Sequence, residues 1–286
     1  GMIHSMTGYG KSVLELPTKT IRLELKSLNS KSLDLNIRMP SMYRAKELEL
    51  RKIIGAQLGR GKIDFSIYVE FNKGVGPSKI NAEVVKGYMK QLKNLSSADA
   101  TELLKMAVRM PDAISTEREE IDPKEWKLIS DEALVVLSKI QNYRKDEGAV
   151  LENDFSKRIS KIDQLLEEVV KIDPERIEHV RERLNRGIAD LKEKVDENRF
   201  EQELIYYIEK LDITEEKIRL KNHLGYFLKN LNLNESNGKK LGFISQEMGR
   251  EINTIGSKAN FAPMQKLVVQ MKDELEKIKE QLLNVL

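Results

Sequence analysis

Ionisable side chains recur at helical spacing in residues 198–258. If this segment is helical, four of them share one stripe, because offsets of four, seven and eleven residues nearly complete whole turns. These residues are Asp212, Glu216, Arg219 and His223. Apolar residues flank the stripe on both sides, so it points toward a core or a cleft. An unpartnered buried charge is costly, so the pattern predicts a metal site, a salt-bridge network or a polar ligand site.

A second stripe repeats the same spacing and offers a facing half for this site. Its members are Glu247, Glu251, Thr254 and Lys258. Facing carboxylates with one imidazole and no sulfur ligand favour Mg²⁺ or Mn²⁺ over a structural zinc. Such an ion activates water and neutralises a phosphodiester, while Arg219, Arg250 and Lys258 would hold phosphate oxygens. Spacing alone leaves the alternative of a purely structural ion-pair network open.

The elements that position these residues follow from hydrophobic periodicity. Apolar and polar residues alternate over 21–26, 33–38 and 63–71, which predicts strands of a sheet with one polar face. Residues 43–58 and 80–95 are predicted helices. The fold class is therefore α+β, with an N-terminal sheet domain that carries helices, a long antiparallel helical hairpin and a C-terminal helical domain.

The remainder of the chain has an almost wholly helical pattern. Apolar stripes on either side of Asp173-Pro174 predict two long helices joined there by a short turn, packed as an antiparallel hairpin. Residues 264–282 form a heptad seam, for which packing against another copy is slightly favoured over packing on the same chain. The predicted domains are residues 2–122, an RNA-facing α+β domain, 123–197, a helical arm, and 198–286, a helical domain with the metal site.

Composition narrows the class of protein. The chain has 286 residues and a net charge of +3, but residues 1–80 hold 14 Lys/Arg against 7 Asp/Glu. A basic front end suggests a polyanionic partner. There are no cysteines, which excludes disulfides and thiolate chemistry. No apolar run reaches the length of a membrane span and no signal peptide is present, so a cytoplasmic protein without a membrane partner is predicted.

Several motifs resemble the YicC/YloC family of bacterial proteins. The run from Phe243 to Ala259 closely resembles the C-terminal signature of that family, and Ser5 to Gly10 resembles its opening motif. Further matches are Lys26 to Lys31, Arg60 to Lys62, Glu203-Leu204, Asp212-Ile213 and Glu215-Glu216. The resemblance covers residues 2–286.

Members of this family are described as stress-related endoribonucleases that need a divalent metal and assemble as hexamers. The resemblance therefore implies a metal-dependent endoribonuclease with Mn²⁺ or Mg²⁺ as cofactor, RNA as partner and a homo-oligomer, a hexamer, as the acting form. The implied catalytic residues are His223, Glu247, Glu251 and Arg219. The implied metal ligands are Glu216, His223, Glu247 and Glu251, with Glu203 and Asp212 as further ligands or as carboxylates that orient the first set.

RNA contacts are predicted on both halves of the chain. The candidates are Lys26, Asn29, Lys31, Arg38, Arg60, Lys62, Arg250 and Lys258. Aromatic stacking partners are sparse in the N-terminal half, which favours recognition of backbone and shape. Two positions depart from the family pattern, because Gly242 stands where Asp is usual and Gly249 where Asn is usual. Either change is expected to weaken a metal or phosphate contact.

Two other functions compete with the nuclease. The first is a non-catalytic RNA-binding adaptor that presents small RNAs to another RNA-decay enzyme, which the basic front end supports. The second is a structural helical oligomer whose buried charges only specify assembly. For a nuclease, the sequence leaves open whether water or the 2′-hydroxyl of the RNA is the attacking group.

Overall fold

The computed structural model describes residues 3–72, 78–116, 121–190, 197–233 and 238–286. The chain forms two compact units. The sheet unit comprises residues 9–27 and 32–141, and the helical unit comprises the described residues of 1–8, 28–31 and 142–286. The predicted α+β class is confirmed. The predicted division into three domains stays a prediction.

The sheet unit is built on four strands in the order β1-β2-β4-β3. Their bounds are β1 Gly8–Glu15, β2 Lys19–Leu28, β3 Leu33–Arg38 and β4 Gly61–Phe71. The strands β3 and β4 are parallel, with Leu33 opposite Gly61 and Arg38 opposite Ser66. A parallel pair needs a crossover, and the helical segment between the two strands supplies it. The three predicted strands are confirmed.

Helices cover one face of this sheet and leave the other face open. The short 3-10 helix Ser41–Lys46 leads into α1 (Glu47–Leu58), and Gly59, at φ 68°, ends α1 in a backbone region that favours glycine. Inward side chains of β2 and β4 pack against α1 and against the first part of α4 (Pro123–Asp190). The alternate side chains of the same strands form the predicted polar face.

A small segment of the sheet unit has its own core. It contains β5 (Ser78–Ile80), α2 (Ala82–Lys93), α3 (Ala100–Ala107) and β6 (Ile114–Thr116), and β5 pairs antiparallel with β6. Val85, Ala107 and Ala113 form its buried cluster, and Leu103 of α3 is also buried. Only α2 was predicted here, because three-residue strands are too short to show periodicity.

The predicted turn at Asp173-Pro174 is wrong, because α4 runs through Pro174 as one helix. Proline inside a helix removes one hydrogen bond and costs about 3 kcal/mol or more. Tertiary contacts on both sides of Pro174 offset that cost. The Nε atom of Arg176 donates to Asp173 Oδ1 at 2.8 Å, and Lys217 Nζ donates to Asp173 Oδ2 at 2.9 Å. The segment around the buried Arg176 is therefore helical, where a turn was predicted.

The antiparallel partner of α4 is α6 (Thr214–Leu231), not the segment that follows Pro174. Phe155 of α4 packs edge-on against Phe227 at 5.9 Å between ring centroids, and Asp163 pairs with Lys221 at 2.6 Å. With Asp173 and Lys217, these contacts run in opposite directions along the two helices. Lys217 and Lys221 of α6 therefore form ion pairs with α4.

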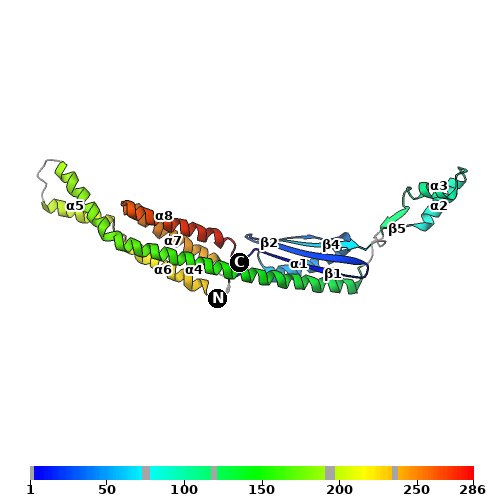
Figure 1. Cartoon of the computed structure of the whole chain (residues 1–286), viewed down its shortest axis with the longest axis horizontal. Coiled ribbons are helices and arrows are strands. Elements are labelled where there is room, and N and C mark those ends of the chain that lie inside the picture. The colour runs from blue at the N-terminus through cyan, green and yellow to red at the C-terminus, as the bar shows by residue number, and fades with distance from the viewer. Residues whose placement is uncertain (1–2, 73–77, 117–120, 191–196, 234–237) are drawn as a thin grey trace. The chain divides into compact units, whose positions relative to one another are not determined.

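Four helices enclose the core of the helical unit, and Figure 1 shows α6, α7 (Gly238–Ala259) and α8 (Ala262–Leu282) alongside the second part of α4. The heptad seam of α8 is buried in this core of its own chain, so the favoured packing against another copy is wrong for the seam. The helix α5 (Glu197–Lys210) buries only Leu204 among its described side chains. Within the described residues, no helix is long and apolar enough to cross a membrane.

Candidate active site

The helices α6 and α7 lie antiparallel, and their register brings the two predicted stripes together. Glu216 pairs with Lys258 near one end, Arg219 pairs with Glu251 further along, and the Lys240 ammonium lies 5.3 Å from the centre of the Tyr226 ring beyond them. Residue numbers rise along α6 while those of their partners fall along α7. The two stripes therefore face each other, as predicted.

Glu216 is buried at the edge of this helix pair, with a side chain 5% exposed. Its Oε1 atom accepts a hydrogen bond from Lys258 Nζ at 2.9 Å and lies 3.8 Å from Arg219 Nη2. The other oxygen, Oε2, is buried and has no hydrogen-bond partner among the described residues. An unsatisfied buried carboxylate oxygen is unfavourable, which marks Glu216 as a group with spare binding capacity.

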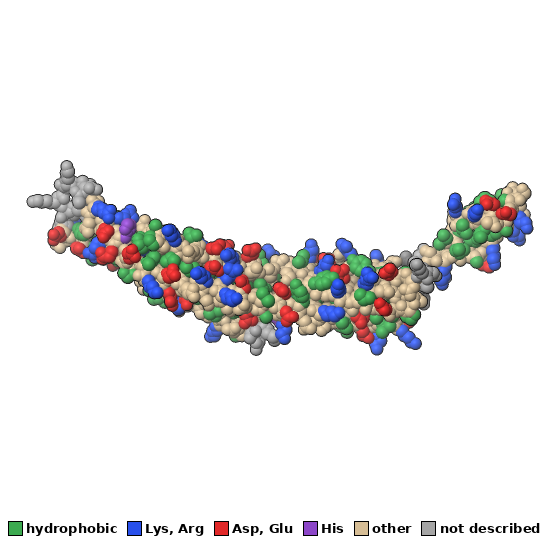
Figure 2. All heavy atoms as spheres, in the orientation of Figure 1, with side chains coloured by type: hydrophobic (Ala, Val, Ile, Leu, Met, Phe, Trp, Pro, Cys, Tyr) green, Lys and Arg blue, Asp and Glu red, His purple; other side chains and the backbone are tan. Residues whose placement is uncertain are grey.

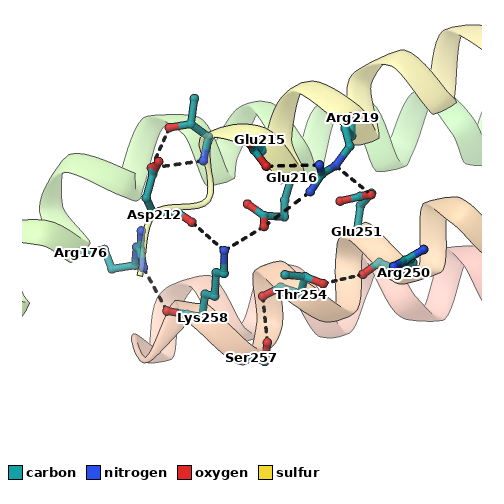
Figure 3. Close-up of polar contacts among 11 residues, drawn as sticks. Arg176, Asp212, Glu215, Glu216, Arg219, Arg250, Glu251, Thr254, Ser257 and Lys258 are labelled. Atoms are coloured by element: carbon teal, nitrogen blue, oxygen red, sulfur yellow. Dashed lines mark hydrogen bonds and ion pairs between the residues drawn. The ribbon is translucent and has the colours of Figure 1, made fainter. Parts of the chain in front are cut away.

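Arg219 connects three carboxylates. Its Nε atom lies 3.1 Å from Glu251 Oε1, and its Nη1 atom lies 3.2 Å from Glu215 Oε2. Glu251 is buried, with a side chain 7% exposed, whereas the Arg219 side chain is 49% exposed. The hydrogen bond to Glu251 is the main reason that the pKa of Arg219 is raised above its usual value. The site thus pairs buried acids with a cation that solvent can reach (Figure 3).

Two further contacts fix the end of the network. Lys258 Nζ also donates to the backbone carbonyl of Asp212 at 3.1 Å, and Arg176 Nη1 donates to the carbonyl of Lys258 at 3.1 Å. The buried Arg176 therefore binds one of the free carbonyls at the C-terminal end of α7. Sequence reasoning missed Arg176, since an arginine beside a proline in a charged run carries no sign of burial.

Asp212 differs from its predicted place. It precedes α6 instead of lying on the helix, and its Oδ1 atom accepts hydrogen bonds from Thr214 Oγ1 at 2.7 Å and Thr214 N at 3.2 Å. The hydroxyl bond is the largest cause of a lowered pKa for Asp212. The Asp212 side chain therefore stabilises the start of α6 and points away from the stripe. The backbone carbonyl of Asp212 still accepts a hydrogen bond from Lys258 in the network.

The other predicted site residues take no part in this network. Glu203 lies exposed on α5, and Arg250 lies exposed on α7. His223 and Glu247 are half-buried, and the register of α6 and α7 places them opposite each other between the Arg219–Glu251 and Tyr226–Lys240 contacts.

The predicted metal ligands do not assemble as a set. In the described part of the chain, no group of three or more His, Asp or Glu side chains is placed to hold a metal ion. Glu216 and Glu251 instead carry Lys258 and Arg219 as counter-charges. The arrangement is an ion-pair network, one of the alternatives that the spacing left open, and the metal stays a prediction.

The N-terminal RNA-binding candidates lie on the outer face and loops of the sheet. Lys26, Arg38 and Lys62 are exposed on β2, β3 and β4. Asn29 and Lys31 are exposed between β2 and β3, and Arg60 is half-buried before β4. Acidic residues interrupt this set, since Glu24 lies 3.6 Å from Lys26 and the surface in Figure 2 mixes both signs of charge. RNA contact by these residues stays a prediction.

Comparison with known proteins covers the whole chain. The family described as Endoribonuclease YicC-like, N-terminal region, matches residues 3–153, and the family described as Endoribonuclease YicC-like, C-terminal, matches residues 169–286. The chain belongs to the YicC-like family. A Clostridioides difficile protein named "Probable endoribonuclease YicC" is 33% identical over 99% of this chain and all of its own length. A Haemophilus influenzae protein of the same name is 28% identical over the same shares.

The structure explains one of the two departures of this YicC-like chain from the family pattern. A Cβ atom on the buried Gly249 would lie 3.2 Å from Leu275 Cδ2 and 3.4 Å from Lys279 Nζ, both on α8. A Cβ atom at position 249 would therefore point toward α8, and the predicted weakening of a metal or phosphate contact there stays a prediction. At Gly242 a Cβ atom would meet nothing within 4 Å.

Proposed function

We propose that this chain is an endoribonuclease that cleaves RNA phosphodiester bonds at the edge of the α6–α7 pair. The observation that carries the proposal is the pairing of two buried carboxylates, Glu216 and Glu251, with two cations that solvent can reach, Arg219 and Lys258. The names of the two full-length relatives support RNA as the substrate.

The charges of this network suit a phosphodiester substrate. A phosphate that reaches the edge meets the exposed part of Arg219 and the Lys258 ammonium, which form strong charge-assisted hydrogen bonds with phosphate oxygens. The bound phosphate then shares these cations with Glu251 and Glu216. A carboxylate that loses part of its counter-charge gains proton affinity, and this prepares it to accept a proton from the attacking hydroxyl.

Metal dependence is a separate proposal. Mg²⁺ and similar ions are held by one or two carboxylates together with water and substrate phosphates. Glu216 and Glu251, with the unsatisfied Oε2 atom of Glu216, fit that kind of site better than a site closed by protein ligands alone. When bound, a divalent ion would supply charge neutralisation to the phosphodiester.

The test is cleavage of a structured RNA by the full chain and by Glu251→Gln, each with Mn²⁺, with Mg²⁺ and with EDTA. General base catalysis contributes about 10²–10⁴-fold, so Glu251→Gln should lose at least about 100-fold in kcat/KM. Glu280→Gln, an exposed glutamate on α8, is the matched control and should keep full activity. Equal cleavage by Glu251→Gln and the control would refute the assignment of the site. If Arg219→Gln also cleaved equally, a contaminating ribonuclease would be the source of the cleavage.

The same experiment separates the competing functions. An adaptor binds RNA in a salt-dependent way but cleaves none with any metal. A purely structural network predicts that Glu251→Gln lowers the melting temperature or breaks an assembly. A variant with unchanged mass and melting temperature and lost activity contradicts the structural reading. End-group analysis of the product decides the attacking group, since a cyclic phosphate indicates the 2′-hydroxyl.

We also propose that the chain acts as a homo-oligomer, a hexamer, in the cytoplasm. The buried seam of α8 no longer supports this assembly. What supports it is α5, whose Ile205, Tyr206 and Tyr207 are 52%, 59% and 40% exposed. Exposed apolar groups of this kind mark interaction surfaces. Light scattering of the purified chain gives its mass, and Ile205→Ser together with Tyr206→Ser should lower it.

A further inference from the structure

Two exposed aromatic rings lie beside the ion-pair network, one on each helix. Tyr226 of α6 is 44% exposed and Phe243 of α7 is 65% exposed. Neither is needed for the core, which buries their neighbours Phe227 and Ile244. A single exposed ring is common on protein surfaces, so what marks this site is that two rings lie on one face together with cations.

The rings and two arginines share one outer face of the helix pair. Arg219 precedes Tyr226 by seven residues, and Phe243 precedes Arg250 by seven residues. Seven residues make about two turns, so each ring lies roughly 10 Å along the helix from an arginine on the same side. Arg219, Tyr226 and Arg250 each follow a stripe residue by three positions, and Phe243 follows by three Lys240, which lies seven residues before Glu247. In two antiparallel helices that face each other, the same offset in residue number rotates a side chain toward the same side of the pair. All four side chains therefore lie on the same face.

The register of α6 and α7 places the two arginines beside each other on this face, and the two aromatic rings beside each other. The Arg219–Glu251 contact puts Arg219 next to Arg250, since residues 250 and 251 are neighbours. The Tyr226–Lys240 contact puts Tyr226 next to Phe243, which lies one turn further along α7 than Lys240. Figure 3 shows Arg219 and Arg250 at the same end of the network. The face therefore has an arginine end and an aromatic end.

A cation sits at the aromatic end as well. Lys240 Nζ lies 5.3 Å from the centre of the Tyr226 ring, and its hydrogen bond to the Tyr226 hydroxyl is the main cause of a lowered pKa for Tyr226. The ammonium fixes the ring from one side. The ring stays accessible, since Tyr226 is 44% exposed with Lys240 in place.

We propose that Tyr226 and Phe243 form a stacking platform for the bases of a single-stranded RNA segment whose phosphates bind Arg219 and Arg250. The proposal rests on the proposed function, and it adds that the substrate is unpaired beside the cleavage point. Base–aromatic stacking tolerates any sequence because every base has a π-face, and a cationic groove that follows the backbone accompanies it in single-strand binders. The platform adds two stacking partners to the few exposed rings of the N-terminal half, Tyr9 and Tyr68.

Charge favours RNA over a second protein copy as the occupant. Lysine is depleted at the centre of protein interfaces, whereas Lys239 and Lys240 lie near these two rings. Lys229, Lys239 and Lys240 lie on α6 and α7 near the rings, and Arg219 and Arg250 lie about two turns away on the same face. A polyanion matches this arrangement, and its affinity falls with rising salt.

The test measures binding of the full chain to a labelled single-stranded 2′-O-methyl RNA by fluorescence anisotropy, with a gel to confirm that the probe stays intact. Tyr226→Ala and Phe243→Ala should each weaken the Kd by about 5- to 150-fold, the range expected for loss of one stacked base. Tyr226→Phe keeps the ring and should bind within about 2-fold of the original chain. Val269→Ala, which changes a residue 64% exposed on α8, is the control and should leave the Kd unchanged.

A second probe isolates stacking from charge. An RNA of equal length with consecutive abasic positions carries the same phosphates, so the original chain should bind it more weakly than the full probe. The Tyr226→Ala, Phe243→Ala double variant should bind both probes equally. Unchanged Kd values for both alanine variants overturn the platform, as does a fall in oligomer mass with RNA affinity intact. Absence of any RNA binding overturns it too.

Failure of the platform and failure of the nuclease give different results. Equal RNA affinity and equal cleavage in Phe243→Ala and the original chain refute the platform and leave the nuclease in place. Binding that depends on both rings, without cleavage in any metal, refutes the nuclease and supports the platform. Melting temperatures equal to that of the original chain confirm that the variants fold, as expected for exposed rings.

Discussion

The Arg219–Glu251 pair yields an asymmetric prediction about stability. At 3.1 Å the two charges attract each other, but the Arg219 side chain is 49% exposed, so solvent screens a large part of that attraction. Burial of the Glu251 carboxylate costs several kcal/mol, so the attraction and the desolvation nearly cancel. Glu251→Gln removes both terms and keeps the shape of the side chain. It should therefore change the free energy of unfolding by less than about 1 kcal/mol.

The reverse change leaves a buried charge without its partner. Removal of one member of a fully buried pair costs about 3–5 kcal/mol. The Arg219 side chain is 49% exposed, so water entering its place recovers part of that cost. Arg219→Gln should therefore destabilise the chain more than Glu251→Gln does, but less than the loss of a fully buried partner would. The double variant, Arg219→Gln with Glu251→Gln, should recover most of the loss.

Urea unfolding followed by circular dichroism measures these effects, and the four chains form a double-mutant cycle in which the effects of the two substitutions should not add. Glu215→Gln is the control, because Glu215 binds the same arginine but is 79% exposed, and it should cost less than about 0.5 kcal/mol. If Glu251→Gln destabilises the chain as much as Arg219→Gln, the pair is a net source of stability and the reasoning fails.

Three further predictions concern packing, pH and a tyrosine. A Cβ atom on Gly148 would lie 1.7 Å from a carbonyl oxygen of the N-terminal segment, so Gly148→Ala should lower the free energy of unfolding by about 1–3 kcal/mol. A Cβ atom on Gly187 in the same helix would meet nothing within 4 Å, so Gly187→Ala should raise it by about 0.5–1 kcal/mol. Thermal unfolding measures both changes. The pKa of Asp212 is lowered in the folded chain, so its contribution to the free energy of unfolding is present above the unfolded pKa and is lost as pH falls through the folded pKa. The pH dependence of urea unfolding in acid should therefore be smaller in Asp212→Asn. An unchanged pH profile would contradict this. Ultraviolet titration should find Tyr226 ionising below the usual tyrosine range, and Lys240→Met should return it to that range; equal titration curves would remove the contact.

The sequence predicted which side chains converge, because helical spacing determines the face on which a residue lies. Glu216, Arg219 and Glu251 meet as the spacing indicated, and Lys258 joins them. The spacing did not predict how their charges compensate one another. That outcome depends on the register of α6 against α7, which places a cation of one helix beside each acid of the other. A residue-by-residue pattern on single helices contains no such register.

The other differences between prediction and structure arise because a local sequence pattern indicates that a helix face is buried, or that the chain bends, but not which part of the protein packs against it. The seam of α8 is buried as the heptad pattern required, but its partner is the core of the same chain. Pro174 favours a break on local grounds, yet the buried Arg176 and its bond to Asp173 hold the helix together. The first strand, Gly8–Glu15, was missed because its glycine-rich start lacks the apolar alternation of the other strands.

The compensated charges of the network also suggest how substrate binding is coupled to reactivity. Glu251 is buried and ion-paired with Arg219 before RNA arrives. Under the proposed function, a bound phosphate draws on the same guanidinium and leaves the Glu251 carboxylate available to accept the proton of the attacking hydroxyl. A single strand stacked on the proposed platform would hold the phosphate there long enough to react. Separate measurements of RNA binding and of cleavage in Glu251→Gln distinguish this coupling from a simple loss of affinity, because the variant should bind RNA at least as tightly as the original chain while cleaving it far more slowly.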